Sequence, residues 1–430
     1  MTTQIETSHQ GADRTLNFIQ AVIADYHPRN FSIRLWDGTE WPAETPDVSF
    51  TLLLKHPAAL RRMLRHIDTD LSLGEAYIYD DIDFEGDIDA VYPVADYLAH
   101  QDWSLGRRIR MGWDLLHLPG EHAQHVGRRA AQVQGQAHSI ERDKQAVTYH
   151  YDVSNDFYAL WLDRRMVYSS AYFSAPDEDL DTAQERKLDM LCRKLRLQPG
   201  ERLLDVGCGW GGLIIHAAKH YGVEALGVTL SQPQADLANQ RISEAGLADR
   251  CRVEVRDYRE IDEREGFDKL VSVGMFEHVG EALLPTYFQR ARRLLRPGGA
   301  FLNHGIAISA TESRAKGPTF SNHYVFPDGE LVPINVTLHH AEQAGFEVRD
   351  VESLREHYAL TLHHWVRRLE AQHEQALQVA DEPTYRIWRL FMSGSAYGFE
   401  QGRLNVYQTL LVKPDGGASG LPLTRTDWYA

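Results

Sequence analysis

The feature that most constrains this chain is an alternation of short apolar runs with helix-like segments from about residue 200 onward. The apolar runs lie at 202–207, 224–230, 252–257, 268–274, 300–308 and 403–413. Helix-like stretches at 213–222, 232–245 and 283–295 separate several of them. Strands separated by helices of this length are typical of a parallel sheet with helices on both faces. We therefore expect an α/β fold for this part of the chain.

The charge distribution divides the chain before this region. Residues 1–102 hold 7 Lys and Arg against 18 Asp and Glu, whereas residues 103–145 carry a net charge of +3. Within the first segment, carboxylates alternate with apolar residues over 78–89, which predicts the solvated face of a small α+β domain. The basic segment, with Trp103 and Trp113, has two interpretations: a helix on an anionic membrane surface, or a helical linker paired to the acidic domain. We favour the linker.

Several classes of protein are disfavoured by composition. A net charge of −16 argues against a general nucleic-acid binder. The chain has no apolar run near the roughly 18 residues that a membrane-spanning helix needs, and its start lacks the basic-then-apolar pattern of a secretory signal. Its three cysteines form no Cys-x-x-Cys pair, so we expect a cytoplasmic protein without a structural zinc or another metal.

The string LLDVGCGWGG indicates a cofactor. It places Gly207, Gly209 and Gly211 between a strand and a helix, where glycine lets the backbone approach a ligand closely. The G-x-G-x-G spacing and Asp205 favour S-adenosylmethionine over a dinucleotide, because an acid can meet its cation and amino group. A nucleotide-type fold without that cofactor is the alternative. The next strand ends in GVTLSQPQ without an acid, so Gln232 or Gln234 would have to bind the ribose.

Further motifs resemble a known family. HYDVSNDFY, LLDVGCGWGG, GVTLSQPQ, GMFEHVG, NHGIA and HYALTL occur in an order that resembles the cyclopropane fatty acid synthase family of S-adenosylmethionine-dependent methyltransferases, over about 140–413. The resemblance implies a class I, Rossmann-like methyltransferase with a mixed seven-stranded sheet and a smaller α+β N-terminal domain. The charge distribution, the resemblance and the glycine-rich end together divide the chain into an acidic lipid-binding or dimerisation domain, a basic helical linker, the catalytic domain and a flexible tail. These segments span 1–102, 103–145, 146–414 and 415–430.

The resemblance also implies roles for individual residues. Beyond Asp205 and the glycine turn, the expected cofactor contacts are Tyr168, Ser169, Thr229, Leu230, Gln234, Tyr258 and Arg259. The residues expected to hold a catalytic bicarbonate ion are Glu277, His304 and Tyr358, with the backbone of Ile306.

The chain departs from the family at two cysteine positions. Ser170 and Ser395 stand where family members carry cysteines, so no thiolate nucleophile can be required. Whether Ser170 acts through its backbone N–H or its side chain stays open.

The expected chemistry explains the types of residue present. An alkene has no proton to remove before it attacks, so a general base cannot activate it, and the enzyme helps by aligning the double bond with the methyl donor. The carbocation that results is stabilised by the faces of aromatic rings and by exclusion of water. Eight aromatic residues lie within 149–173, and we interpret them as the lining of a substrate tunnel, with ordinary core packing as the alternative. Glu277 and His304 follow or lie within strands, so both can reach the carboxyl edge of the sheet.

These observations predict a reaction. We expect transfer of a methylene from S-adenosylmethionine to the cis double bond of an unsaturated phospholipid acyl chain, giving a cyclopropane ring. The alternatives are a methylene- or methyl-branched product, methylation of a small amine, and a lipid-binding scaffold without catalysis. The acidic, partly apolar surface of the first domain could pair two chains or couple the catalytic unit to a bilayer, so we expect a homodimer in the cytoplasm that associates peripherally with the membrane.

Overall fold

The computed structural model describes residues 2–64, 70–118, 127–151, 153–262, 264, 266–312 and 319–429. The chain forms two compact units, and each is assembled from separate segments. Unit 1 consists of Met1–Ala130, Ala315–Val325 and Asp381–Tyr397, and unit 2 consists of Ala131–Arg314, Phe326–Ala380 and Gly398–Ala430. The sequence predicts a continuous first domain ending at residue 102, so the structure differs in adding two later segments to it.

Unit 1 is built on a small mixed sheet. Its strands run in the order β2-β1-β3-β4, with β1 parallel to β3 and the two outer pairs antiparallel. The strands are β1 (Phe31–Arg34), β2 (Glu40–Trp41), β3 (Phe50–Leu54) and β4 (Ile82–Gly86). The helices are α1 (Thr2–Val22), α2 (Ala59–Met63), α3 (Leu71–Ile78), α4 (Val91–Ala99), α5 (Leu105–Leu116), α12 (Phe320–Tyr324) and all but the last turn of α16 (Glu382–Glu400).

Ion pairs and hydrogen bonds explain why the late segment belongs to unit 1. The Arg386 guanidinium of α16 donates to the Tyr77 carbonyl at 2.9 Å and pairs with Asp83 at 3.1 Å. Arg389 donates to the Tyr77 hydroxyl at 2.8 Å. Asp81, which lies in the acidic stretch predicted to be solvated, is buried and pairs with His56. Charge alternation in the sequence therefore marks β4 but does not reveal which of its carboxylates have partners from distant segments.

Unit 2 has the predicted α/β fold with a mixed seven-stranded sheet. The strand order is β10-β11-β9-β8-β5-β6-β7, in which β11 is antiparallel to both of its neighbours and the other pairs are parallel. The strands are β5 (Arg202–Val206), β6 (Glu224–Thr229), β7 (Cys251–Val255), β8 (Phe267–Val273), β9 (Leu295–Ile308), β10 (Glu347–Ser353) and β11 (Leu404–Val412).

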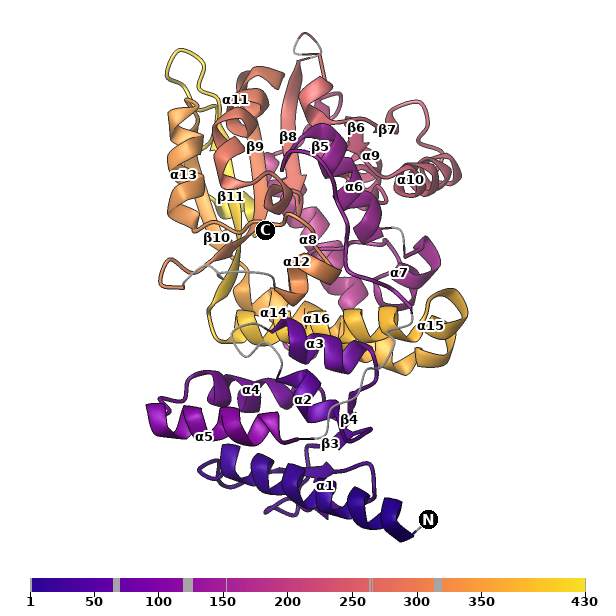
Figure 1. The fold of residues 1–430 in the computed structure, drawn as a ribbon. Helices are drawn as coiled ribbons and strands as arrows, with labels where there is room; N and C mark the ends of the chain where they lie inside the picture. Colours follow the sequence, from indigo (N-terminus) through magenta and orange to yellow (C-terminus); the bar gives the residue numbers. More distant parts are fainter. Residues whose placement is uncertain are drawn as a thin grey trace. The chain divides into compact units, whose positions relative to one another are not determined.

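Helices cover both faces of this sheet (Figure 1). On one face lie α8 (Leu180–Leu195), α9 (Gly212–Tyr221) and α10 (Gln232–Glu244). On the other face lie α11 (Leu284–Leu294) and α13 (Ile334–Gln343). The remaining α-helices of unit 2 are α6 (Ile140–Tyr151), α7 (Asn155–Trp161), α14 (Arg355–Ala371) and α15 (His373–Val379).

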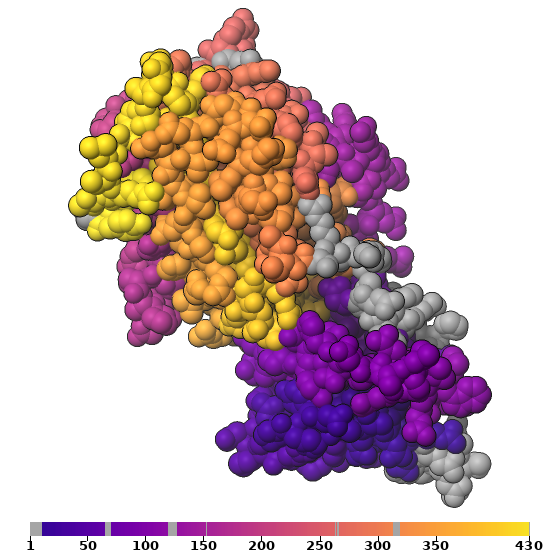
Figure 2. Space-filling view, turned by 90° about the vertical axis from the view of Figure 1, so that its left-hand side faces the viewer, coloured from indigo at the N-terminus to yellow at the C-terminus, as the bar shows by residue number. Residues whose placement is uncertain are grey.

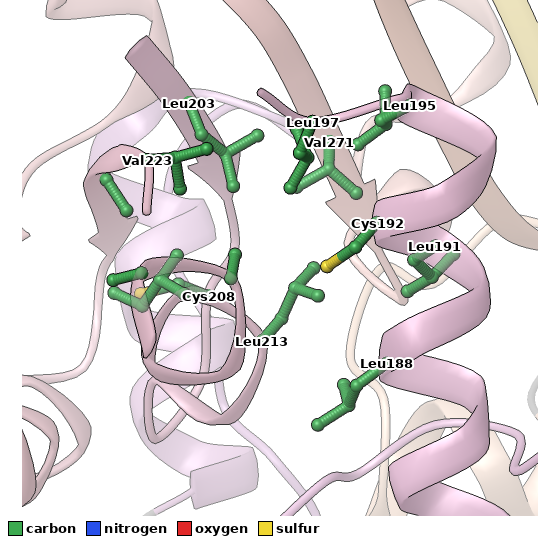
Figure 3. Packing of buried hydrophobic residues seen from close by; sticks show 14 of the residues in the cluster. Leu188, Leu191, Cys192, Leu195, Leu197, Leu203, Cys208, Leu213, Val223 and Val271 are labelled. Atoms are coloured by element: carbon green, nitrogen blue, oxygen red, sulfur yellow. The ribbon is translucent and has the colours of Figure 1, made fainter. Parts of the chain in front are cut away.

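Helix α8 shows how local sequence and packing agree. Its first turn is capped by Asp179, whose side chain accepts a hydrogen bond from the Thr182 backbone N–H at 3.0 Å. Apolar residues then recur every three or four positions, which places them on one face. Figure 3 shows Leu188, Leu191 and Cys192 on the side of α8 toward the sheet and α9. All three are fully buried, so this face is part of the core of unit 2.

The last residues of the chain differ from the predicted flexible tail. Trp428 lies in the 3₁₀ helix η5 (Thr426–Trp428) and is only 2% exposed, as part of the same core cluster as α8. The cations of Lys194, Arg196 and Arg425 lie over its ring at 5.2 to 5.6 Å, and Asp427 pairs with Arg196. Figure 2 shows the yellow C-terminal residues of unit 2 lying on the surface of that unit. A single tryptophan after a glycine-rich loop anchors this segment.

Within the part of the chain that the structure describes, no helix has the length and apolar character needed to cross a bilayer.

This anchoring leads to a stability prediction. Trp428→Ala should lower the free energy of unfolding by about 3 kcal/mol, because it removes a large buried side chain and leaves a cavity. The neighbouring Tyr429 is 60% exposed, so Tyr429→Ala should change the free energy by less than about 0.5 kcal/mol. Urea unfolding followed by circular dichroism measures both variants. Equal stabilities would contradict the anchoring.

Candidate active site

A cleft lies at the carboxyl ends of the central strands of unit 2. It holds about 1180 Å³ of space, part of it open to solvent, at the edge where β5, β6 and β8 end. Its lining includes ten of the predicted cofactor residues: Tyr168, Ser169, Asp205, Gly207, Gly209, Thr229, Leu230, Gln234, Tyr258 and Arg259. The carboxyl ends of parallel strands meet at one edge, which is why residues so far apart in sequence share one cleft.

The glycine turn shapes the floor of this cleft. Gly207, Gly209 and Gly211 all have positive φ, at 81°, 53° and 77°. A Cβ at Gly207 would lie 2.6 Å from Cβ of Met275, whereas a Cβ at Gly209 would meet nothing within 4 Å. Gly211 instead caps the start of α9 and is not among the residues that line the cleft. Gly211 is therefore needed for the backbone conformation of the turn, whereas Gly207 and Gly209 also line the cleft.

A buried acid and a buried base lie beside the turn. Asp205 is 2% exposed, and its Oδ1 has no hydrogen-bond partner among the described residues. Desolvation raises its pKa to about 7, against the opposing charge of Lys187. Lys187 lines the same cleft and donates to Ser169 Oγ at 2.8 Å, and desolvation lowers its pKa to about 7. Lys187 is not among the site residues predicted from the sequence, although a lysine one residue before Leu188, on the apolar face of α8, is a visible signal.

The segment after β6 contains both glutamines that the sequence offers for binding the ribose, and they lie in different environments. Gln234 is buried in the cleft wall, and its Oε1 accepts a hydrogen bond from Thr229 Oγ1 at 2.8 Å. Gln232 is exposed and donates to Asp236 on the outer side of α10. The structure therefore places Gln234, and not Gln232, where a ribose could be bound.

The 3₁₀ helix η1 (Tyr258–Glu260) forms another wall. The Arg259 guanidinium donates to both carboxylate oxygens of Asp257 and to Asp143 at 2.8 Å. Bidentate pairing of this kind fixes the plane of the guanidinium. Asp143, from α6, lines the cleft and was not predicted as a site residue.

A second group of polar residues lies beside the cleft, on or directly after strands β8 and β9 and on helix α14. Glu277, in the 3₁₀ helix η3 (Phe276–His278) after β8, accepts a hydrogen bond at Oε1 from the Ile306 backbone N–H at 2.7 Å. Its Oε2 is buried and, within the described chain, has no partner. Desolvation raises the pKa of Glu277 to about 7, in spite of the bond from Ile306. The structure brings Glu277 and Ile306 together as the resemblance implies.

His304 has a similar orphaned atom. It is 1% exposed on β9, and strand pairing places Gln408 of β11 directly opposite. The Gln408 amide nitrogen lies 3.3 Å from His304 Nδ1, whereas Nε2 has no partner in the described residues. Burial lowers the pKa of His304 well below its usual value, so the ring is neutral. An amide nitrogen can only donate, so with the Gln408 amide in this orientation Nδ1 accepts and the ring proton is on Nε2.

Tyr358, on α14, is the third member of the predicted anion-binding group. It is buried, and desolvation together with the negative charge of Glu277 raises its pKa above its usual value.

The structure gives Ser170 a different environment. Its hydroxyl donates to the Ala171 carbonyl at 3.0 Å, and the Ala171 backbone N–H donates to Thr361. The Ser170 hydroxyl therefore donates its proton to the backbone of the next residue. Ser395 lies on α16, in the segment that belongs to unit 1.

The aromatic residues separate into two kinds. Tyr151 and Tyr168 line the cleft, with ring centroids 6.4 Å apart. Tyr158 and Trp161 are fully buried behind them, as ordinary core residues would be. Trp365 of α14 packs against Tyr168 at 5.3 Å and was not anticipated, because it lies far away in the sequence. Within the 149–173 cluster, some rings thus line the cleft and others are ordinary core residues.

Comparison with known proteins gives a family match over this part of the chain. The family model described as mycolic acid cyclopropane synthetase matches residues 138–409, and a model of a domain of unknown function matches residues 18–101. A probable fatty acid methyltransferase of Pseudomonas putida is 43% identical over 401 residues, which are 92% of this chain and 95% of that protein. Cyclopropane mycolic acid synthase 3 of Mycobacterium tuberculosis is 37% identical over 62% of this chain and 96% of its own length.

Solved structures agree with these matches. The cyclopropane synthase MmaA2 of Mycobacterium tuberculosis superposes with a TM-score of 0.59 at 33% identity, over 62% of this chain and 97% of its own. The mycolic acid cyclopropane synthase CmaA1, solved in complex with SAH and CTAB, gives 0.59 at 35% identity over the same shares.

The residues of the cleft fit S-adenosylmethionine. The glycine turn leaves open space above Gly209, and the orphaned carboxylate oxygen of Asp205 suits a cationic or amino group. Gly207→Ala should therefore weaken binding of S-adenosylhomocysteine at least about tenfold, because the new Cβ would push Met275 into the cleft. Isothermal titration calorimetry measures the affinity.

The control for this prediction is Gly246→Ala. Gly246 has a φ of 68° but nothing within 4 Å of an added Cβ. This variant should lose about 1 kcal/mol of stability from backbone strain and keep the affinity of the unmodified chain. Equal affinities for the two variants would show that the turn does not shape the cofactor site.

Proposed function

Because the chain belongs to the cyclopropane synthase family of S-adenosylmethionine-dependent methyltransferases, we propose that it transfers a methylene to the cis double bond of an unsaturated phospholipid acyl chain. The chain is an S-adenosylmethionine-dependent C-methyltransferase. The observation that carries the finer proposal is a pair of buried orphaned atoms beside the cofactor cleft: Glu277 Oε2 in η3, which follows β8, and His304 Nε2 on the neighbouring strand β9.

The relatives support an acyl-chain substrate. Two proteins that align over 92% of this chain, from Pseudomonas putida and Mycobacterium tuberculosis, are named probable fatty acid methyltransferases. Others are named cyclopropane mycolic acid synthases. A phospholipid of a bilayer is our choice among acyl carriers, and it makes the enzyme a peripheral membrane protein.

The cleft residues prepare the reaction. Bound S-adenosylmethionine supplies an electrophilic methyl group, and Asp205, the glycine turn and Gln234 would hold it. Tyr151 and Tyr168 present ring faces to the cleft, where their negative quadrupoles stabilise positive charge on the alkylated chain. The rings packed behind them exclude water that would otherwise quench that charge.

The orphaned pair suits a small anion. Bicarbonate would be held by Glu277, His304 and Tyr358 and would supply a proton acceptor beside the transferred carbon. Two carboxylate charges would repel each other there, but a Glu277 pKa of about 7 lets its carboxyl keep a proton and donate it as a hydrogen bond. Neutral His304 donates from Nε2, since Gln408 occupies Nδ1. The site thus offers donors to an anion without needing a cationic residue.

A branched product is the second candidate. The two relatives that align over 92% of this chain are named fatty acid methyltransferases and not cyclopropane synthases, and loss of a different proton from the same cation would give a branch. A small-amine N-methyltransferase has less use for a proton acceptor buried beside the cofactor, so the pair of Glu277 and His304 disfavours it.

The first test is lipid mass spectrometry of a bacterial host that expresses the chain and is fed methionine with a deuterated methyl group. We expect unsaturated acyl chains to gain one carbon and keep two deuterium atoms, because one is lost as the ring closes. Mild hydrogenation then distinguishes the products, since a methylene branch is reduced and a ring is not. A host whose acyl chains gain no mass, while the purified protein binds S-adenosylmethionine, would remove the lipid assignment.

Glu277→Gln and His304→Ala should each lower turnover at least about 100-fold and leave the affinity for S-adenosylhomocysteine within about twofold. Both residues act on the proton and not on the cofactor. Glu224→Gln, at the exposed start of β6, serves as the matched control and should behave as the unmodified chain. Near-normal turnover in either active-site variant would exclude the assignment of the anion site.

The raised pKa of Glu277 predicts a pH dependence. Its carboxyl holds a proton below about pH 7 and loses it above, so the rate at constant bicarbonate should fall as the pH rises through that value. Residual turnover of Glu277→Gln should lack this alkaline decline, because an amide does not titrate. A decline of the same midpoint in both proteins would assign it to another group.

The homodimer is a prediction from the acidic, partly apolar surface of the first domain and has a simple test. Light scattering of the full chain at micromolar concentration should give twice the chain mass of 49.0 kDa. A mass of one chain would remove it.

A further inference from the structure

Helix α5 of unit 1 exposes an unusual amount of apolar surface. Leu105, Ile109, Trp113 and Leu116 are 75%, 64%, 65% and 65% exposed. Their spacing of four, four and three residues places them on one stripe of the helix. No other helix in the described ranges exposes as many large apolar side chains. A stripe of this kind is a contact surface for something outside the chain.

The inner face of α5 is determined by its attachment to α1, which lies beside it (Figure 1). Arg107 donates to the Ala21 carbonyl at 2.7 Å and pairs with Asp25 at 3.4 Å. Residue 107 lies about 200° around the helix from residues 105 and 109, because each residue adds about 100°. The apolar stripe therefore points away from unit 1.

Arginines flank the stripe on both sides. Arg108 and Arg110 are exposed and adjacent in sequence to Ile109, so they project about 100° to either side of it. Residues 1–102 of the same unit carry a net charge of −11, whereas α5 carries three arginines and one aspartate. An anionic surface would thus attract α5 and repel the acidic remainder of the unit.

We propose that α5 docks unit 1 on the anionic face of a phospholipid bilayer, with Leu105, Ile109, Trp113 and Leu116 in the headgroup and acyl boundary and Arg108 and Arg110 on lipid phosphates. An apolar stripe with basic flanks and an aromatic ring is the arrangement of interfacial helices. The inference rests on the proposed function for the choice of a lipid as the occupant, and it assigns the basic segment a membrane contact in place of the linker favoured from sequence.

The test measures sedimentation of the full chain with vesicles of unsaturated phosphatidylcholine, with and without phosphatidylglycerol. The unmodified chain should bind the anionic vesicles and dissociate as salt is raised. Ile109→Ser with Trp113→Ser, and separately Arg108→Glu with Arg110→Glu, should each weaken binding at least about tenfold. Leu377→Ser and Arg250→Glu, at exposed positions of unit 2, are the matched controls and should bind as the unmodified chain does.

Activity distinguishes this inference from the proposed function. On vesicles the α5 variants should turn over at least about tenfold less, whereas on detergent-dispersed unsaturated phospholipid they should match the unmodified chain within twofold. An unmodified chain that modifies neither substrate would exclude the proposed function, while loss of vesicle binding in the variants would still support the α5 contact.

Two outcomes would overturn the inference. One is vesicle binding that is absent in the unmodified chain or unchanged in both α5 variants. The other is a fall in mass from two chains to one in Ile109→Ser with Trp113→Ser, with vesicle binding retained, which would make the stripe an interface between copies of this chain. Light scattering and far-ultraviolet circular dichroism on each variant complete the comparison, the latter showing that the helix content is kept.

Discussion

Burial of polar groups without a hydrogen-bond partner is the constraint on which the site depends. Asp205, Glu277 and His304 come from or directly follow β5, β8 and β9, which are adjacent in the sheet, so the fold buries three titratable groups at one edge. Each keeps an atom unpaired among the described residues. Such atoms cost free energy unless a ligand satisfies them. Desolvation then brings the pKa values of both carboxyls to about 7, where protonation can change during turnover.

The packing around this edge separates the candidate cofactor site from the candidate anion site. The glycine turn and Met275 form the floor of the cleft, whereas Glu277, two residues later, turns its carboxylate to the Ile306 backbone on the neighbouring strand. One short segment after β8 therefore contributes residues to both candidate sites. Helix α14 contributes two aromatic rings next to the site: Trp365 packs against Tyr168, which lines the cleft, and also against Tyr358.

Much of the fold was predictable because its signals are local. The strand–turn–helix at Gly207 and the helical spacing of α8 can be identified within a few residues, and the mixed seven-stranded sheet followed from the resemblance. Other features depend on distant segments. The anchoring of the end of the chain by Trp428 and the inclusion of α16 in unit 1 both arise from contacts between residues far apart in sequence. No local pattern specifies such partners.

The sequence by itself determined which chemical groups are present and the order in which they follow strands, including the glycines, Glu277 and His304. Only the tertiary structure determined the protonation and the hydrogen-bond partners of these groups. The pairing of β9 with β11 places Gln408 opposite His304 and so assigns the ring proton, and the depth of burial sets the pKa of Glu277. The reason is physical: residue type and spacing act along the chain, whereas register and desolvation depend on what the folded chain places around each atom.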